Sequence, residues 1–290
     1  MKYINLKNKN ILVTGADGFI GSHLVERLIK LNCSVHAMSL YNSHNNWGWL
    51  DDLDNEAKSK IKVTSGDIRD YKYVKNCLKG IDIVFHLASL IAIPYSYHSP
   101  NSYVQTNIQG TLNILEASLD SNIKKFIHTS TSEVYGDTTK VPINENTQVI
   151  SKSPYSATKI AADQLAYSYF STYDLPVSII RPFNTYGPRQ SNRAIIPTIL
   201  TQVLTGKKNI KLGSIYPTRD FSYVDDTVNG FIEIARHDTS TGEVINIGSG
   251  YEISIEDLVH LIEDITSSEI NIITDKKRIR PKSGEVIRLK

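Results

Sequence analysis

Residues 11–31 read ILVTGADGFIGSHLVERLIKL, an apolar run joined to a helical pattern through three glycines. Ile11–Thr14 is short and apolar and ends at Gly15, which is the pattern of a buried strand. From Phe19 to Leu31, apolar residues recur on one side of a helix at Ile20, Leu24, Leu28 and Leu31. The stretch therefore predicts a strand, a tight turn and a helix in direct succession.

The three glycines, Gly15, Gly18 and Gly21, lie where the predicted strand passes into the predicted helix. In a dinucleotide-binding turn, one glycine makes the turn, one admits the pyrophosphate, and one lets the helix pack against the sheet. The helix N-terminus then stabilises the negative charge. The spacing is GxxGxxG rather than GxGxxG, so a plain glycine turn is the alternative. The flanking strand and helix favour a dinucleotide.

The alternation of strands and helices continues to residue 181. Further strands are predicted at 34–40, 61–64, 81–87, 125–129 and 177–181, with helices at 71–78, 101–119 and 154–173. This order predicts an α/β fold of the Rossmann type, a doubly wound parallel sheet covered on both faces. Shorter elements punctuated by Gly and Pro then predict a smaller mixed α/β region. We divide the chain into a dinucleotide-binding domain, 1–181, and a mainly substrate-binding region, 182–290.

Composition argues against several classes of function. The 290 residues carry a formal net charge of +2, so there is no general electrostatic case for binding nucleic acid or a membrane. No apolar run reaches the ~20 residues of a membrane span, and the first residues lack a signal-peptide core. The two cysteines, Cys33 and Cys77, provide neither a disulfide framework nor a metal site. We expect a soluble cytoplasmic protein without a metal.

Tyr155 and Lys159 are four residues apart on a predicted helix and therefore share a face. A tyrosine hydroxyl has an ordinary pKa of ~10, and a neighbouring ammonium group lowers that pKa, as a general base requires. The spacing alone is weak evidence, because Tyr71 and Lys75 repeat it. A surface pair is the alternative. The hydroxyl-rich segment HTSTSEVYG at 128–136 favours catalysis.

The glycine spacing, the Tyr-x-x-x-Lys pair and the Thr-Ser-Glu triplet at 131–133 together resemble the extended short-chain dehydrogenase/reductases that act on nucleotide sugars. The resemblance runs along nearly the whole chain and implies NAD or NADP, tightly bound and recycled. It places the cofactor along the glycine loop and the ends of the third and fourth strands. The residues so implied are Gly15, Asp17, Gly18, Phe19, Ile20, Gly21, Asp67, Ile68, Leu87, Ala88 and Ser89, with Tyr155 and Lys159.

The second predicted strand departs from the pattern of NAD-binding members. Such members end this strand with an acid for the ribose 2′-hydroxyl, and here the position is Ser39. Serine cannot repel a 2′-phosphate, and Asn42 and Ser43 could contact one. The sequence therefore favours NADP over NAD.

The resemblance also assigns catalytic roles. Thr131 would hydrogen-bond the sugar hydroxyl, Tyr155 would take its proton as hydride leaves C4, and Lys159 would tune Tyr155 and hold the nicotinamide ribose. A 4-keto group acidifies the proton at C5, so Glu133 could abstract it before the C6 hydroxyl leaves and hydride returns to C6. Those are the steps of a 4,6-dehydratase. The acid for C6 departure stays open between water, Ser132 and Glu133, and a structural acid is the alternative for Glu133.

Substrate contacts are implied after residue 181 by the same resemblance. They would serve the sugar diphosphate and its ribose, and each has a solvated surface residue as its alternative. The residues are Asn184, Arg193, Arg219, Arg280 and Glu285. The segment LIAIPYSYH at 90–98 would suit an N-acetyl methyl group, although core packing explains it equally well.

Longer stretches, such as YNSHNNWGWLDDL and RPFNTYGPRQSNRAIIPT, resemble the nucleotide-linked N-acetylglucosamine 4,6-dehydratases of bacterial legionaminic acid biosynthesis. The nucleotide would be GDP or UDP. UDP-glucuronate decarboxylases and 4-epimerases of the same family stay open, as does a non-catalytic dinucleotide-sensing protein. Family members pair through two long helices, so we expect a homodimer through 101–119 and 154–172. Relatives usually continue past residue 290, so we also expect a C-terminally incomplete substrate region.

Overall fold

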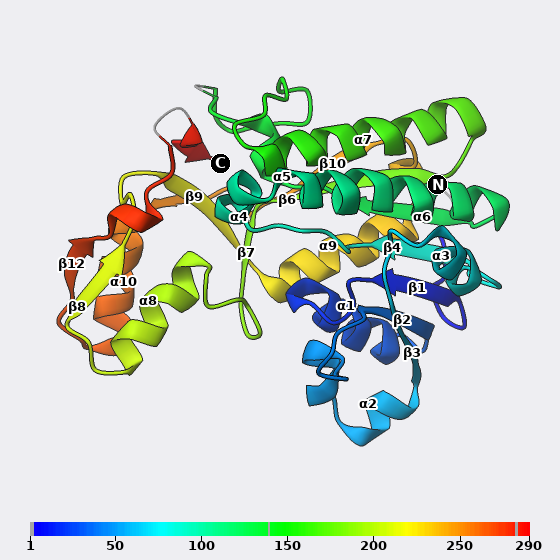
Figure 1. Cartoon of the computed structure of the whole chain (residues 1–290), viewed down its shortest axis with the longest axis horizontal. Coiled ribbons are helices and arrows are strands. Elements are labelled where there is room, and N and C mark those ends of the chain that lie inside the picture. The colour runs from blue at the N-terminus through cyan, green and yellow to red at the C-terminus, as the bar shows by residue number, and fades with distance from the viewer. Residues whose placement is uncertain (1–2, 139, 282–283) are drawn as a thin grey trace.

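The computed structural model describes residues 3–138, 140–281 and 284–290. Its larger layer is a seven-stranded sheet in the order β10-β6-β5-β4-β1-β2-β3, with every pair parallel (Figure 1). The strands are β1 Asn10–Thr14, β2 Ser34–Leu40, β3 Ile61–Gly66, β4 Ile83–His86, β5 Lys125–Thr129, β6 Val177–Pro182 and β10 Val244–Ile247. The Rossmann-type fold predicted from the sequence is confirmed.

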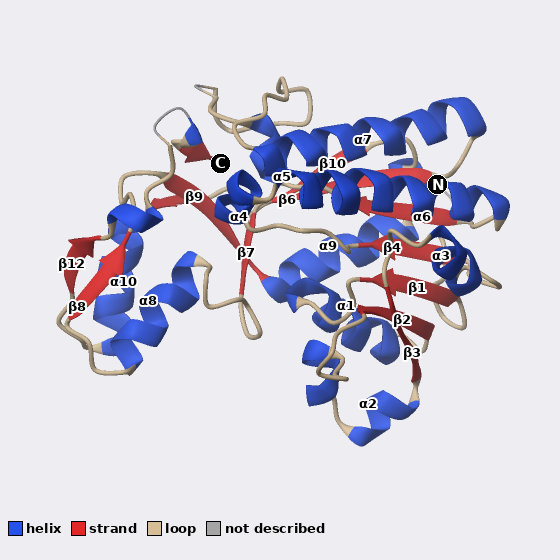
Figure 2. Ribbon diagram, in the orientation of Figure 1, coloured by secondary structure: helices blue, strands red, loops and turns tan. Residues whose placement is uncertain are grey.

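Helices cover both faces of this sheet (Figure 2). One face carries α1 Phe19–Lys30 and α9 Val224–Arg236, and the other carries α3 Tyr71–Cys77, α6 Gly110–Asp120 and α7 Pro154–Tyr173. Two apolar cores result, one containing Leu24 and Phe231 and the other containing Val74, Ile114 and Ala166. Burial on both faces explains why the central strands are continuously apolar rather than alternating.

The helix predicted at 101–119 is interrupted. It is built from α5 Pro100–Tyr103, a π-helical turn at Val104–Gln109 and then α6. Asn107 lies in the π turn and is buried, with its amide bonded to both backbone groups of Leu90 at 2.8 and 2.9 Å. A π turn adds a residue to the helix and redirects side chains, and such turns often occur at functional sites. Asn107 thereby fixes the segment that follows β4.

A smaller lobe forms beside the carboxyl end of the sheet (Figure 1). Its core lies between α8 Ile195–Leu204, α10 Ile255–Thr266 and the pair β8 Asn209–Leu212 with β12 Asn271–Thr274. A second small sheet joins β7 Asn184–Tyr186, β9 Thr218–Tyr223, β11 Glu252–Ser254 and β13 Arg288–Leu289. Because α9 and β10 return to the larger layer, the chain crosses the proposed 181/182 boundary more than once. That division stays a prediction.

The remaining short elements connect these layers. They are α2 Asn55–Ser59, α4 Ile93–His98 and 3₁₀ turns at Gly48–Asp52, Ser132–Tyr135, Asp238–Ser240 and Lys276–Arg278. Among the described residues, no helix has both the length and the apolar character needed to cross a bilayer.

Candidate active site

The glycine loop packs tightly against the end of β4. Gly15 has a φ of +67°, and a Cβ there would lie 2.9 Å from the backbone of Ala88. A Cβ on Gly21 would overlap the Gly15 carbonyl oxygen. Side chains are excluded at both positions because the loop, α1 and the chain after β4 approach so closely.

The start of α1 fits the pyrophosphate of a dinucleotide. Gly18 is its N-cap residue, with no side-chain cap, and the first turn contains no acidic residue. Gly18 is exposed, whereas Phe19 and Ile20 are half-buried. An uncapped helix N-terminus with an exposed glycine favours an anion, so the predicted role of this loop is consistent with its geometry.

A chain of hydrogen bonds fixes the predicted cofactor residues at the end of β4. The Thr14 hydroxyl accepts from the backbone N–H groups of Leu87 and Ala88, both at 3.1 Å, and lies 2.8 Å from His86 Nδ1. Burial holds the pKa of His86 well below its usual value, so its ring is neutral at pH 7. Ser89 is half-buried, and its hydroxyl donates to the Leu87 carbonyl at 3.4 Å.

The two predicted cofactor residues Asp67 and Ile68 follow β3. Asp67 forms an ion pair with Arg69 at 2.5 Å, and the hydrogen bond from Arg69 lowers the pKa of Asp67. Ile68 is buried under Gly110, and its carbonyl accepts from the Asn113 amide at 2.9 Å. The structure therefore holds the Ile68 backbone firmly, and the Asp67 carboxylate is engaged by a neighbour.

The three residues predicted to face a 2′-phosphate differ in exposure. Ser39 is buried, and its hydroxyl lies 3.0 Å from that of Ser65 on β3. Asn42 is half-buried and donates to the Asn46 carbonyl at 2.9 Å. Ser43 is exposed. Of the three, Asn42 and Ser43 have side chains outside the core, and Ser39 does not.

Tyr155 and Lys159 are buried on the same face of α7, which begins with a capping box formed by Ser153 and Ser156. Burial raises the pKa of Tyr155 and outweighs its side-chain hydrogen bond with Thr131, which lowers it. The Lys159 ammonium donates instead to the Thr129 carbonyl. The lowered pKa that the sequence predicted for Tyr155 is therefore wrong for this structure. Burial also lowers the pKa of Lys159, to about 8.

A buried charged network lies one helical turn further along α7. The Asp163 carboxylate accepts from Arg181 Nη2 at 2.9 Å, Arg181 Nε at 3.2 Å and the Ser130 hydroxyl at 2.9 Å. His128 Nε2 lies 3.3 Å from the other carboxylate oxygen, without the alignment of a hydrogen bond. Asp163 was not predicted from the sequence, although its position four residues after Lys159 on the same face could have identified it.

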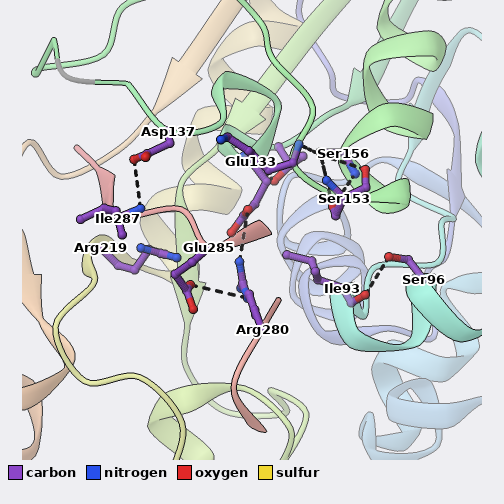
Figure 3. A network of polar contacts seen from close by, with 12 residues as sticks. Ile93, Ser96, Glu133, Asp137, Ser153, Ser156, Arg219, Arg280, Glu285 and Ile287 are labelled. Atoms are coloured by element: carbon purple, nitrogen blue, oxygen red, sulfur yellow. Dashed lines mark hydrogen bonds and ion pairs between the residues drawn. The ribbon is translucent and has the colours of Figure 1, made fainter. Parts of the chain in front are cut away.

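The predicted base, Glu133, lies in the 3₁₀ turn after β5. The Thr131 hydroxyl caps this turn by accepting the Glu133 N–H at 3.2 Å. The Glu133 carboxylate lies 3.7 Å from the Arg280 guanidinium, which also lies 3.9 Å from Glu285 (Figure 3). Arg219 is buried beside them, and burial lowers its pKa. Four predicted residues, Glu133, Arg219, Arg280 and Glu285, therefore meet in one cluster.

The other predicted residues lie around this cluster. Ser132 is buried in the same turn, and Asn184 is half-buried at the start of β7. Arg193 is exposed. Burial raises the pKa of Tyr103, against the opposing charge of Arg193, and the Tyr103 ring lies 6.3 Å from that of Tyr155. The site thus presents Tyr155 and Lys159, two carboxylates and several cations at the carboxyl edge of the sheet, where open α/β sheets bind ligands.

Sequence and structure comparisons agree with this geometry. Residues 12–288 match the family model described as GDP-mannose 4,6 dehydratase. The low-salt glycan biosynthesis protein Agl12 of Haloferax volcanii is 34% identical over 91% of this chain and 84% of its own length.

Two solved structures show the same fold. The dTDP-glucose 4,6-dehydratase DesIV of Streptomyces venezuelae, determined with NAD, gives a TM-score of 0.86 at 29% identity, over 97% of this chain and 87% of that one. The UDP-glucuronic acid 4-epimerase of Bacillus cereus, with its substrate and NAD, gives a TM-score of 0.86 at 31% identity, over 97% and 89%. The chain belongs to the GDP-mannose 4,6 dehydratase family of nucleotide-sugar dehydratases and epimerases.

Proposed function

We propose that the protein is an NAD(P)-dependent nucleotide-sugar 4,6-dehydratase, a lyase that forms a 4-keto-6-deoxy sugar. The observation that carries the proposal is that Thr131 contacts both Glu133 and Tyr155. Its hydroxyl accepts the Glu133 N–H and hydrogen-bonds the Tyr155 side chain, so a carboxylate is held next to the acid–base tyrosine. Oxidation at C4 needs only the tyrosine, whereas loss of water from C5 and C6 needs a base as well.

The dinucleotide, when bound, supplies the oxidant that accepts hydride from C4 and returns it to C6. In this mechanism Thr131 orients the sugar hydroxyl, and Tyr155 accepts its proton. In this structure Lys159 donates to the Thr129 carbonyl, and a protonated Lys159 turned toward Tyr155 would favour the tyrosinate and oppose the effect of burial. Glu133 then removes the C5 proton, which the C4 ketone has acidified. The C6 hydroxyl leaves as water after taking a proton from the protonated Glu133, from Ser132 or from a water molecule.

We further propose an N-acetylhexosamine as the sugar, carried on GDP or UDP, in legionaminic acid biosynthesis. Ile93, Tyr103 and Tyr155 form one apolar cluster against which Leu90 and Tyr97 pack. An apolar wall beside the acid–base tyrosine would accommodate an acetyl methyl group. The proposed cofactor is NAD or NADP.

A 4-epimerase or decarboxylase acting on UDP-glucuronate is the second candidate. The observation in its favour is Arg280, a cation 3.7 Å from Glu133 that could hold a sugar carboxylate.

We also propose a cytoplasmic homodimer that pairs through α6 and α7. Tyr167 and Tyr173 of α7 are exposed, and both cysteines are free and buried.

The test is the substitution Glu133→Gln, with each protein incubated with GDP- and UDP-N-acetylglucosamine. We expect dehydration, measured as loss of one water from the product mass, to fall by about 10²–10⁴-fold, because a general base is removed. Reduction of the nicotinamide, measured by absorbance, should persist because C4 oxidation does not need Glu133. Glu256→Gln, an exposed change on α10, is the matched control.

The possible outcomes separate the candidates. Full dehydration by Glu133→Gln would show that Glu133 is not the base. An unchanged mass with a new sugar isomer in the wild type would mean an epimerase, and loss of carbon dioxide from UDP-glucuronate would mean a decarboxylase. Binding of a dinucleotide without turnover of any nucleotide sugar would favour the non-catalytic sensing protein.

A further inference from the structure

The end of β2 contains no carboxylate of its own. Ser39 stands where NAD-binding members of the fold place an acid, and only 1% of its surface is exposed. Its hydroxyl is turned toward β3, where it lies 3.0 Å from that of Ser65. Ser39 therefore offers neither a charge nor an accessible hydroxyl to a ribose above the strand end.

A carboxylate reaches the same place from the glycine loop. The Ala16 N–H donates to the Met38 carbonyl at 3.2 Å, so the loop runs alongside the last residues of β2. The next residue, Asp17, accepts the Leu40 N–H on Oδ2 at 3.2 Å. The side chain of Asp17 is thereby fixed at the carboxyl end of β2, one residue beyond the buried Ser39.

A second segment holds Asp17 in this position. The Asp17 carbonyl accepts the Trp49 N–H at 3.1 Å. Gly48 has a φ of +55°, and a Cβ there would lie 2.7 Å from the same carbonyl oxygen. The turn at Gly48–Asp52 thus packs directly on the loop residue, and Asp17 remains half-buried rather than fully covered.

In the described part of the chain, Asp17 forms no ion pair, and its carboxylate accepts from the Leu40 N–H. Burial raises its pKa, and backbone N–H groups, including that of Leu40, lower it. Among the described residues, no lysine or arginine contributes to that pKa. An anionic group placed against Asp17 would therefore meet repulsion that no ion pair of Asp17 within the described ranges relieves.

We propose that Asp17 is the residue by which this protein distinguishes NAD from NADP. Its carboxylate takes the place of the missing acid at Ser39, accepts hydrogen bonds from the adenosine ribose hydroxyls and repels a 2′-phosphate. The inference rests on the proposed function only in that a dinucleotide binds the glycine loop. It replaces the preference for NADP that the identity of Ser39 alone suggested.

The experiment is calorimetric titration of the nucleotide-free full chain with NAD⁺ and with NADP⁺. We expect the wild type to bind NAD⁺ more tightly. Asp17→Asn should reduce the ratio of the two affinities by about 10- to 100-fold, because hydrogen bonds to a charged group and the repulsion are both lost. Asparagine keeps an oxygen for the Leu40 N–H, so the loop should stay folded.

The control is Asp51→Asn, which removes a carboxylate that accepts the Trp47 N–H at 2.8 Å in the adjoining turn. It should leave the affinity ratio unchanged. Raising the ionic strength should reduce the preference of the wild type for NAD⁺, a test that needs no variant.

A wild type that prefers NADP⁺, or an Asp17→Asn variant with an unchanged ratio, would overturn the inference while leaving the dehydratase proposal intact. A wild type that binds neither dinucleotide would overturn both.

Discussion

Two clusters of charge, one containing Asp163 and the other Glu133, both act on the pKa of Tyr155, and they are built differently. In the buried cluster, Arg181 reaches Asp163 through two nitrogens at 2.9 and 3.2 Å, and both side chains are at most 6% exposed. In the open cluster, Arg280 lies 3.7 Å from Glu133 and 3.9 Å from Glu285, and 24% of its side chain is exposed. One cation is fixed by its partners, whereas the other is shared loosely between two.

The difference indicates a division of labour. A buried ion pair with paired hydrogen bonds holds its geometry, and loss of one partner leaves an uncompensated charge in the core. A partly exposed pair beyond hydrogen-bond distance contributes little energy and can exchange partners. The buried cluster is therefore suited to positioning Lys159, and the open cluster to meeting a substrate that brings its own charges.

The largest effect is expected for Asp163→Ala. Removal of the carboxylate leaves Arg181 buried without its ion-pair partner, which costs about 3–5 kcal/mol of stability. Urea unfolding, followed by circular dichroism, measures the change. A loss below about 1 kcal/mol would mean that the two clusters do not differ as described.

A double variant sharpens this first prediction. Asp163→Leu combined with Arg181→Met replaces the whole pair by apolar groups of similar size, which is often neutral in a buried site. The double variant should therefore recover much of the stability that Asp163→Ala loses. A double variant as unstable as the single one would mean that packing, rather than the unpaired charge, explains the loss.

A smaller effect is expected from His128, which faces Asp163 on one side and the ring of His86 at 5.8 Å on the other. Burial lowers its pKa, and Lys159 and Arg181 lower it further, against the opposing effect of Asp163. Below pH ~6.5 His128 therefore binds a proton in the unfolded chain but not in the folded chain. Stability falls as the pH falls through that value.

His128→Gln should reduce that acid sensitivity. Between pH 6.5 and 5.5 the variant is expected to lose about 1 kcal/mol less stability than the wild type. Urea midpoints at the two pH values measure the difference. Equal losses in both proteins would show that folding does not lower the pKa of His128.

The fold was predictable because its signals are local. The glycine loop between an apolar run and an amphipathic helix predicted β1 and α1, and the alternation that followed predicted the parallel sheet. The π turn at Val104–Gln109 was not predictable, because the hydrogen bonds of Asn107 to Leu90 arise only in the folded chain. The return of β10 to the sheet was missed for the same reason, since its partner β6 lies far away in the sequence.

The candidate site was predictable where residues share one element. Tyr155 and Lys159 lie on α7 at the expected spacing, and Thr131 and Glu133 share one turn. The pKa of Tyr155 was not predictable, because it depends on burial and on the direction that Lys159 takes. Asp17 was placed in the cofactor loop by resemblance alone, and its bond to Leu40 appears only when β1 and β2 are side by side.

The smallest effect on stability is expected for Arg280→Gln. The guanidinium lies beyond hydrogen-bond distance of both carboxylates and is partly exposed, so its loss should change the free energy of unfolding by less than about 1 kcal/mol. Its effect on the reaction should be larger. If Arg280 binds the substrate diphosphate, KM should rise by about 10- to 100-fold, the range for a lost hydrogen bond to a charged group.

Arg278→Gln is the matched control for Arg280, because Arg278 lies in the same segment and forms a comparably long ion pair with Asp275, at 3.6 Å. Steady-state kinetics on both variants, with urea unfolding alongside, separates binding from stability. A large loss of stability in Arg280→Gln would mean that the ion pairs of Arg280 stabilise the fold as those of the buried cluster do. A normal KM would mean that Arg280 does not bind the diphosphate. The buried Arg219 would then be the cation that binds it, because Arg219 is the other arginine beside Glu133 and Glu285 in the described part of the chain.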